Sequence, residues 1–179
     1  MSGIRPYENS NGSIQVDLSS NMCLCVWPFM SMEQKWSAPI YNLTYGFVGH
    51  VLKGSFTNVV YEPVEDKAGR YQLFKTVVTV GQDPHLQSMG VLVNMREVSR
   101  MSYYPGLHYT LPAKTWHTYH RHEHTITILE KTEPPWAEDG SLSMIALPVG
   151  GEPDILFNKY SKSPEELWKV ISEVLSKTR

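Results

Sequence analysis

Residues 45–61 read YGFVGHVLKGSFTNVVY and contain two runs, 45–52 and 55–61, that are rich in aromatic and β-branched side chains. Such residues are enriched in β-strands because they pack well on a pleated surface. Between the runs, Lys53 and Gly54 form a short glycine-containing link of the kind that closes a hairpin. The stretch therefore predicts two strands joined by a tight turn.

Strand-like runs also occur on both sides of this stretch. The segment MCLCVW at 22–27 is a short apolar run, which is typical of a buried strand. Further strands are expected at 71–80, 90–98, 107–111, 115–119, 125–129 and 142–147. Proline and glycine interrupt the chain between them. Eight or more short strands with regular turn signals predict an all-β sandwich, jelly roll or barrel.

One helix is expected, at the C-terminal end. Ser163 is a good N-cap, Pro164 suits the first helical position, and Glu166 completes a capping box. The apolar residues that follow have helical spacing: Leu167, Val170, Ile171, Val174 and Leu175. We expect residues 1–160 to form a β-barrel domain. Residues 161–179 should form an amphipathic helix packed on the barrel or on a dimer partner.

Composition narrows the class of protein. The 179 residues suit a single domain. The 16 basic and 18 acidic side chains give a net charge of -2, which argues against a nucleic-acid polymer as the partner. No run of 18 apolar residues is present, so no membrane-spanning helix is expected. Residues 1–13 also lack the apolar segment of a secretory signal.

The two cysteines, Cys23 and Cys25, stand two apart and should share one face of a strand. Adjacent positions on one strand give poor disulfide geometry. We expect free, buried thiols, hence a reducing compartment and a cytoplasmic location. A Cys-x-Cys metal pair is the alternative, but there is no second cysteine pair to complete it.

Histidines concentrate in the segment YYPGLHYTLPAKTWHTYHRHEHTITIL at 103–129. Imidazole is the commonest metal ligand and a near-neutral acid or base, so this enrichment indicates a site. No His-Glu-x-x-His motif and no phosphate-binding glycine loop is present. We favour exposed turn positions over metal ligation for His120, His122 and His124. His108 and His117 are the other two histidines of the segment.

Two parts of the chain resemble the motifs of the cupin superfamily. Gly106, five residues, Pro112, one residue, Lys114, two residues and His117 resemble the second cupin motif, with lysine where glycine is usual. The following TITIL at 125–129 looks like the next strand of cysteine-dioxygenase-like cupins. Upstream, GHVLKGSFTNVVYEP at 49–63 resembles the end of the first motif, with Gly54 as its closing glycine.

The resemblance spans roughly residues 41–129, about half of the chain. It implies an all-β, cupin-type jelly roll, or double-stranded β-helix barrel, which agrees with the independent strand count. With the C-terminal α-helix, this is the fold that we expect.

The metal ligands of the first motif are missing. Counting back from Gly54, the family's glutamate falls at Phe47, and its two histidines fall at Tyr41 and Leu43. Only His117 remains, whereas a metal cupin needs three or four convergent ligands. We therefore expect no metal or other cofactor, and iron only if the chain is a dioxygenase. Tyr41, Leu43, Tyr45 and Phe47 alternate, so they should line an aromatic barrel interior.

The preferred function is non-catalytic binding of a small aromatic anion or nucleotide-like molecule. Aromatic walls supply stacking surface, and basic side chains supply donors for phosphate or carboxylate. The expected ligand-binding residues are Tyr41, Tyr45, Phe47, Arg96, Tyr109, Lys114, His117, Tyr119 and Arg121. Arg96 has an alternative as an outward-facing charge. A homodimer is expected, and viral anti-defence proteins that sequester nucleotide signals would fit this description.

Two other classes stay open. The chain could be an enzyme, either a cysteine-dioxygenase-like non-haem iron dioxygenase or a metal-free isomerase with His117 and a tyrosine as its acid–base pair. It could also be a structural domain whose barrel is filled with side chains. Fold alone does not choose among these classes, because cupins carry many functions.

Overall fold

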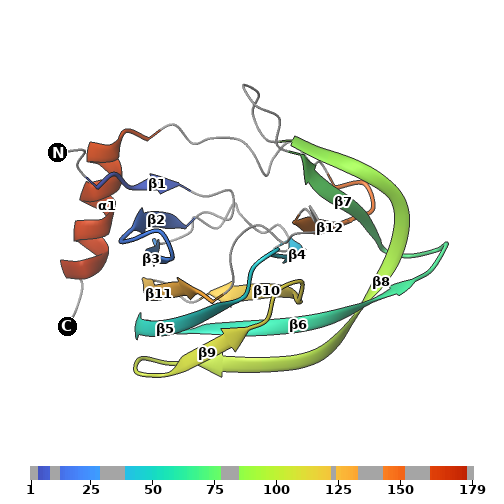
Figure 1. Ribbon diagram of the computed structural model, residues 1–179, viewed down its shortest axis with the longest axis horizontal. Coiled ribbons are helices and arrows are strands. Elements are labelled where there is room, and N and C mark those ends of the chain that lie inside the picture. Colours follow the sequence, from blue (N-terminus) through green and yellow to red (C-terminus); the bar gives the residue numbers. More distant parts are fainter. Residues whose placement is uncertain are drawn as a thin grey trace.

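A computed structural model describes residues 4–8, 13–28, 39–77, 85–121, 124–132, 143–151 and 162–176. These residues form an all-β antiparallel fold with one helix (Figure 1). Its elements are β1 (Tyr7–Glu8), β2 (Ile14–Asp17), β3 (Met22–Trp27), β4 (Ile40–Asn42), β5 (Phe47–Lys53), β6 (Phe56–Glu65), β7 (Tyr71–Val77), β8 (His85–Tyr103), β9 (His108–Leu111), β10 (Trp116–Arg121), β11 (Thr125–Lys131), β12 (Met144–Pro148) and α1 (Pro164–Ser176).

The strands make two six-stranded sheets, as in a sandwich or jelly roll. The first sheet has the order β1-β2-β3-β11-β5-β9, and the second has the order β10-β4-β12-β7-β8-β6. β10 pairs with both β4 and β6, so the second sheet closes on itself. The expected all-β fold is therefore confirmed.

The connection at Lys53 and Gly54 is not a hairpin, so that prediction is wrong. β5 pairs with β9 and β11 in the first sheet, whereas β6 pairs with β8 and β10 in the second. The chain therefore crosses from one sheet to the other at Gly54. The connection from β10 to β11 crosses back between the same two sheets.

The two crossovers lie against each other. Thr125 Oγ1 donates a hydrogen bond to the carbonyl of Ser55 at 2.8 Å and accepts one from the Ser55 amide at 3.3 Å. Gly54 has a φ of +71°, and a Cβ there would lie 2.7 Å from Thr125 Oγ1 and 2.8 Å from Thr125 Cα. Only glycine fits both the backbone angle and the space.

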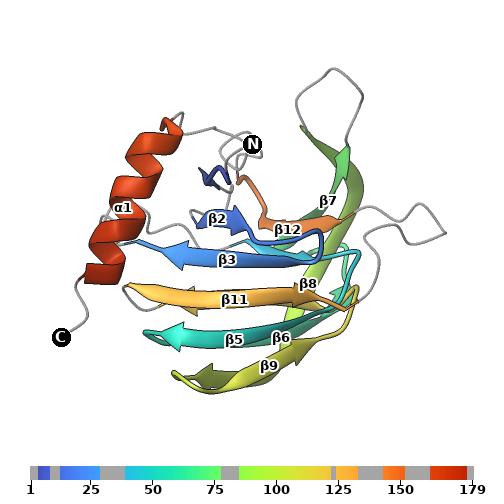
Figure 2. The same cartoon turned by 60° about the vertical axis from the view of Figure 1, so that its left-hand side comes forward.

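The helix is stabilised locally and by packing. Ser163 and Glu166 form the expected capping box, with Ser163 N donating to Glu166 Oε2 at 2.7 Å and Glu166 N donating to Ser163 Oγ at 3.3 Å. Figure 2 shows α1 running across the strands of the first sheet. A shared apolar cluster joins them: Ile14, Val16, Val26, Ile126, Leu167, Ile171 and Val174. This helix is too short and too polar to cross a membrane.

The chain from 152 to 161 lies outside the described residues, so the domain boundary at residue 160 stays a prediction.

Several strands were missed or underestimated. β1, β2 and β4 have two to four residues each, too few for a clear alternating pattern. β8 spans 19 residues rather than the expected 90–98, and Val93 is its one buried residue. It pairs with β7 through its first half and with β6 through its second, which explains its length (Figure 1).

We expect Gly54→Ala to destabilise the fold more than Gly90→Ala. Gly90 has a similar φ of +68°, but a Cβ added there would meet no atom of the described residues within 4 Å. The Gly90→Ala variant therefore measures only the loss of stability that a side chain causes at a left-handed backbone angle, roughly 1–2 kcal/mol. At Gly54 the methyl group also meets the Thr125 backbone, which should add about 1–3 kcal/mol. Urea unfolding of both variants measures the difference, and equal losses would contradict the crossover contact.

Candidate functional site

The described residues form a cavity of about 330 Å³ between the two sheets. Its walls come from the inner faces of both sheets and from the connections that join them. The first sheet contributes Gln15, Cys23, Cys25, Trp27, Phe47, Leu129 and Lys131, and Ser13 lies just before β2. The second sheet contributes Tyr41, Asn42, Thr76, Tyr119 and Ile145, and the connections contribute Pro39, Leu43, Tyr45 and Ser143.

Aromatic side chains dominate the inner wall. Tyr41, Tyr45 and Phe47 all line the cavity, as does Leu43. They do not belong to one strand, because β4 ends at Asn42 and β5 begins at Phe47. Burial raises the pKa of Tyr45 to about 12, so its phenol is neutral near pH 7. Trp27 and Tyr119 face the same space, with ring centroids 6.3 Å apart.

His117 is fully buried and packs against this aromatic wall rather than lining the cavity. Its ring centroid lies 4.6 Å from that of Tyr41 and 5.1 Å from that of Tyr119. His117 Nδ1 lies 2.8 Å from the carbonyl oxygen of Thr115. A carbonyl only accepts, so Nδ1 carries the hydrogen and Nε2 is a bare acceptor. Nε2 is buried without a hydrogen-bond partner among the described residues.

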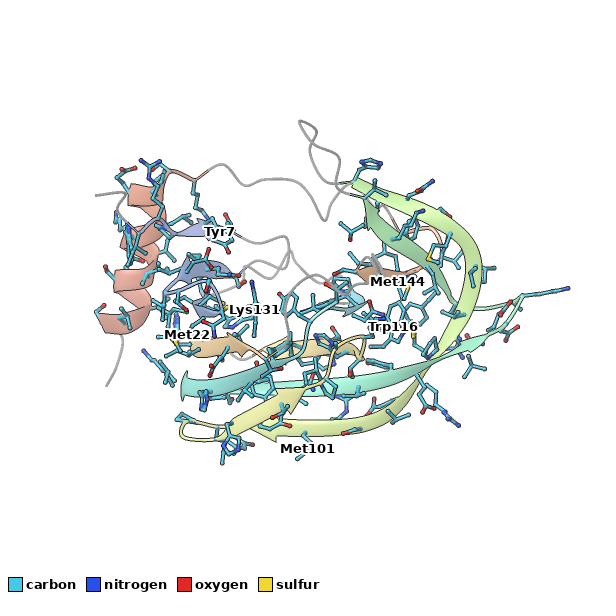
Figure 3. The ribbon with its side chains drawn as sticks, in the orientation of Figure 1. Tyr7, Met22, Met101, Trp116, Lys131 and Met144 are labelled. Carbon is cyan, nitrogen blue, oxygen red and sulfur yellow. The ribbon has the colours of Figure 1, made fainter. Side chains whose placement is uncertain are left out.

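Lys131 is the one basic side chain among the described residues that line the cavity. Its Nζ lies 5.1 Å from the Tyr45 ring centroid, within the range of a cation–π interaction. It extends from the end of β11, on the side of the first sheet away from α1 (Figure 3). Lys131 was not among the expected ligand-binding residues, although period-two alternation from Thr127 and Leu129 places it on the inner face.

Cys23 and Cys25 are free, buried thiols that face the cavity from β3. Their Sγ atoms lie 3.8 Å apart. The expectation of buried free thiols on one strand face is therefore confirmed.

Four of the expected ligand-binding residues do not join the cavity wall. Arg96 is exposed and forms an ion pair with Glu62 on the neighbouring strand, so it is an outward charge rather than an anion clamp. Lys114 is exposed in a turn. Tyr109 is buried in the adjoining core against Phe47 and Phe56. His117 lies behind the wall and packs against it.

The Arg121 side chain falls outside the described residues, so its expected role is not addressed by the structure. Tyr119 lines the cavity, and its role in ligand binding stays a prediction.

The other histidines that the structure describes do not gather around His117. His108 is exposed on β9 opposite His50, with ring centroids 5.9 Å apart. His120 is exposed as expected, but it lies within strand β10 and not in a turn, so that part of the prediction is wrong. His124 is a half-buried turn residue with a φ of +57°, and His122 lies outside the described residues.

An iron centre does not fit the described residues. No three metal-ligating side chains of the histidine, cysteine or carboxylate type converge in the part of the chain that the structure describes. The resemblance to cupins would assign metal ligands to positions 41, 43 and 47, but of Tyr41, Leu43 and Phe47 two have no donor atom. We therefore derive no reaction step through a metal.

The sequence matches no protein-family model, and no curated protein is significantly similar to it. The functional interpretation therefore depends on the cavity and on the chemistry of its wall.

We expect the stability of the fold to fall below pH 6.5 because of His117. Burial lowers its pKa from 6.5 to about 4, so between these values the unfolded chain binds a proton that the folded chain does not. From pH 7 to pH 4.5 this residue should remove about 2 kcal/mol of unfolding free energy. The rings facing it come from Tyr41, Phe47 and Tyr119, which carry no charge at these pH values.

Urea unfolding at both pH values tests this expectation. His117→Asn should lose most of this difference of about 2 kcal/mol. The matched variant His120→Asn changes an exposed histidine of the same strand and should keep it. An unchanged pH dependence in His117→Asn would show that this histidine is not buried in its neutral form.

Proposed function

We propose that this chain binds a planar aromatic anion in the cavity between its two sheets and performs no chemistry on it. The observation that carries the proposal is an aromatic-walled cavity of about 330 Å³ with one lysine at its side. Small-molecule sites are mostly apolar, with a few polar groups that orient the ligand, and occupy about 300–1,000 Å³. This cavity lies at the small end of that range, which favours a ligand of mononucleotide size or smaller.

The aromatic wall favours a planar ring in the ligand. Tyr41, Tyr45 and Trp27 present ring faces or edges, and such contacts add about 0.5–1.5 kcal/mol beyond apolar burial. Asn42 also lines the cavity, but its Oδ1 already accepts a hydrogen bond from the Met144 amide at 3.0 Å. Ser143 lines the cavity as well and carries a hydroxyl group.

Lys131 favours an anionic group, and a single one. It is the one cation among the described lining residues, so a ligand with several phosphates would leave charge uncompensated in a partly buried site. An aromatic carboxylate or a nucleoside monophosphate suits this arrangement. Sequestration of such a molecule, as in viral anti-defence proteins, is one biological setting that fits, and we propose a cytoplasmic homodimer as the working form.

The likeness to cupins supports the same proposal. Lys114 stands where the second motif has glycine, and it adopts a φ of +61°, in the left-handed region that favours glycine. Gly54, at the end of the first motif, has a φ of +71°. His117 pairs across the β10–β4 ladder with Tyr41, which stands at a lost ligand position. These features support a metal-free cupin relative.

Binding without chemistry is favoured over the two other classes. His117 has a bare Nε2 that could act as a base, but it does not line the cavity, so it has no direct contact with a ligand there. A purely structural barrel would be filled with side chains, whereas this one leaves room for a small molecule.

We expect purified protein, made without a histidine tag, to contain far less than one iron, nickel or zinc ion per chain. The reason is that Tyr41, Leu43 and Phe47 leave His117 without partner ligands. Elemental analysis measures this ratio directly. A ratio near one that disappears in His117→Ala would favour the dioxygenase instead.

We expect aromatic carboxylates or nucleoside monophosphates to raise the melting temperature, while sugars and aliphatic amino acids do not. A ligand at 100 times its dissociation constant adds about 2.7 kcal/mol. For a chain of this size the shift is about 5–10 °C. Differential scanning fluorimetry with a panel of both classes measures it.

Two lysine variants distinguish ligand binding in the cavity from binding at the protein surface. Lys131→Met should weaken binding about 10- to 100-fold, because it removes a charge-assisted hydrogen bond. Lys114→Met removes an exposed lysine outside the cavity and should leave binding unchanged. If no compound of either class shifts the melting temperature, the binding proposal is wrong and the structural class is favoured.

A further inference from the structure

Cys23 and Cys25 form a thiol pair that the proposed binding function does not use. Alternation on β3 points both side chains toward the cavity, and their Sγ atoms lie 3.8 Å apart. The side chains are 6% and 2% exposed, so the cavity is their main route to small molecules. Trp27, Tyr119 and Leu129 pack around them.

The separation of the sulfurs indicates the geometry of an atom held between them. With a typical metal–thiolate bond of about 2.3 Å, a separation of 3.8 Å gives a bond angle at the bridging atom of about 110°. A linear two-coordinate ion would need its sulfurs about 4.6 Å apart at the same bond length. The pair therefore suits a bent centre rather than a linear one.

The bridging atom must also be one that needs only two ligands from the protein. No third histidine, cysteine or carboxylate joins the pair within the described structure. A tetrahedral zinc ion would keep two open positions, so the pair alone is half of a structural zinc site. A trivalent centre that brings its own organic substituent needs only two thiolates.

We propose that Cys23 and Cys25 form a bidentate site for a monosubstituted trivalent arsenical whose organic group occupies the aromatic cavity. Each thiol loses its hydrogen and forms one arsenic–sulfur bond. An arsenic that enters with two hydroxyl groups releases them as two molecules of water. No atom changes oxidation state, so neither an oxidant nor a reductant is required.

The surroundings favour this reaction. A hydrogen bond between the two thiols lowers the pKa of the Cys23 thiol, and the nearby ammonium group of Lys131 lowers it further. Burial and the negative charge of Asp17 act in the opposite direction. The nucleophile is the thiolate, so a lowered pKa at Cys23 favours attack on arsenic by this pair. Trp27 and Tyr119 then offer apolar contact to an aryl substituent on arsenic.

Phenylarsine oxide is a suitable probe, because the chain has two cysteines and any dithiol adduct must involve this pair. We expect one equivalent, added to the reduced native chain, to reduce the number of thiols titratable after unfolding from two to none. Intact mass should rise by one phenylarsenic group less two hydrogens. Excess glutathione should not reverse the adduct, whereas 2,3-dimercaptopropanol should.

The melting temperature shows whether the fold itself builds the site. Two cysteines this close in sequence can also chelate arsenic in the unfolded chain, which would leave stability unchanged or lower. A site preorganised in the folded state binds more tightly there, so the adduct should raise the melting temperature. An unchanged or lower melting temperature would overturn the proposal, as would two titratable thiols after treatment.

Single variants supply the matched control. Cys23→Ser and Cys25→Ser each keep one thiol and should form only an adduct that glutathione reverses. If either variant fails to fold, the thiol count and melting temperature of the natural chain still decide the question. A variant that carries both Cys23→Ser and Cys25→Ser tests the two proposals independently. It should lose the dithiol adduct but still bind aromatic anions if the proposed function is correct.

Discussion

The contact between Gly54 and Thr125 determines how the two sheets are joined. Both residues stand where the chain crosses from one sheet to the other, and Thr125 Oγ1 bridges the Ser55 amide and carbonyl. A side chain at Gly54 would collide with the Thr125 backbone. Because β5 and β6 diverge here, as do β10 and β11, this one contact fixes the relative position of four strands.

The contact between the two crossovers also explains which residues line the cavity. β11 leaves it along the first sheet and ends at Lys131, while β10 approaches it along the second and carries His117 and Tyr119. Alternation then sends every second side chain inward. β3 lies beside β11 in register, with Leu129 opposite Cys23, so the thiols face the same space. The cavity is thus a consequence of strand pairing rather than of a specialised loop.

The sequence predicted what depends on local interactions. Residues 22–27 and the capping box of Ser163 and Glu166 were located correctly because alternation and capping act over a few residues. It failed at Gly54, where a glycine link is compatible with either a hairpin or a crossover and only distant pairing decides. Arg96 was ambiguous for a similar reason, since its partner Glu62 is brought close by the β6–β8 ladder.

His117 Nε2, which has no hydrogen-bond partner among the described residues, lies in an interior built from the neutral rings of Tyr41, Phe47 and Tyr119. A charged imidazolium there would be buried among rings without a counterion, and burial accordingly lowers the pKa of His117 to about 4. The Thr115 carbonyl holds the neutral tautomer, so no metal is needed to satisfy Nδ1. Lys131 pairs directly with Phe47 across the β11–β5 ladder, and its Nζ lies 5.1 Å from the Tyr45 ring centroid, so the one cation of the described cavity wall stands beside aromatic rings. Such a wall favours a guest whose anionic group lies close to its aromatic ring.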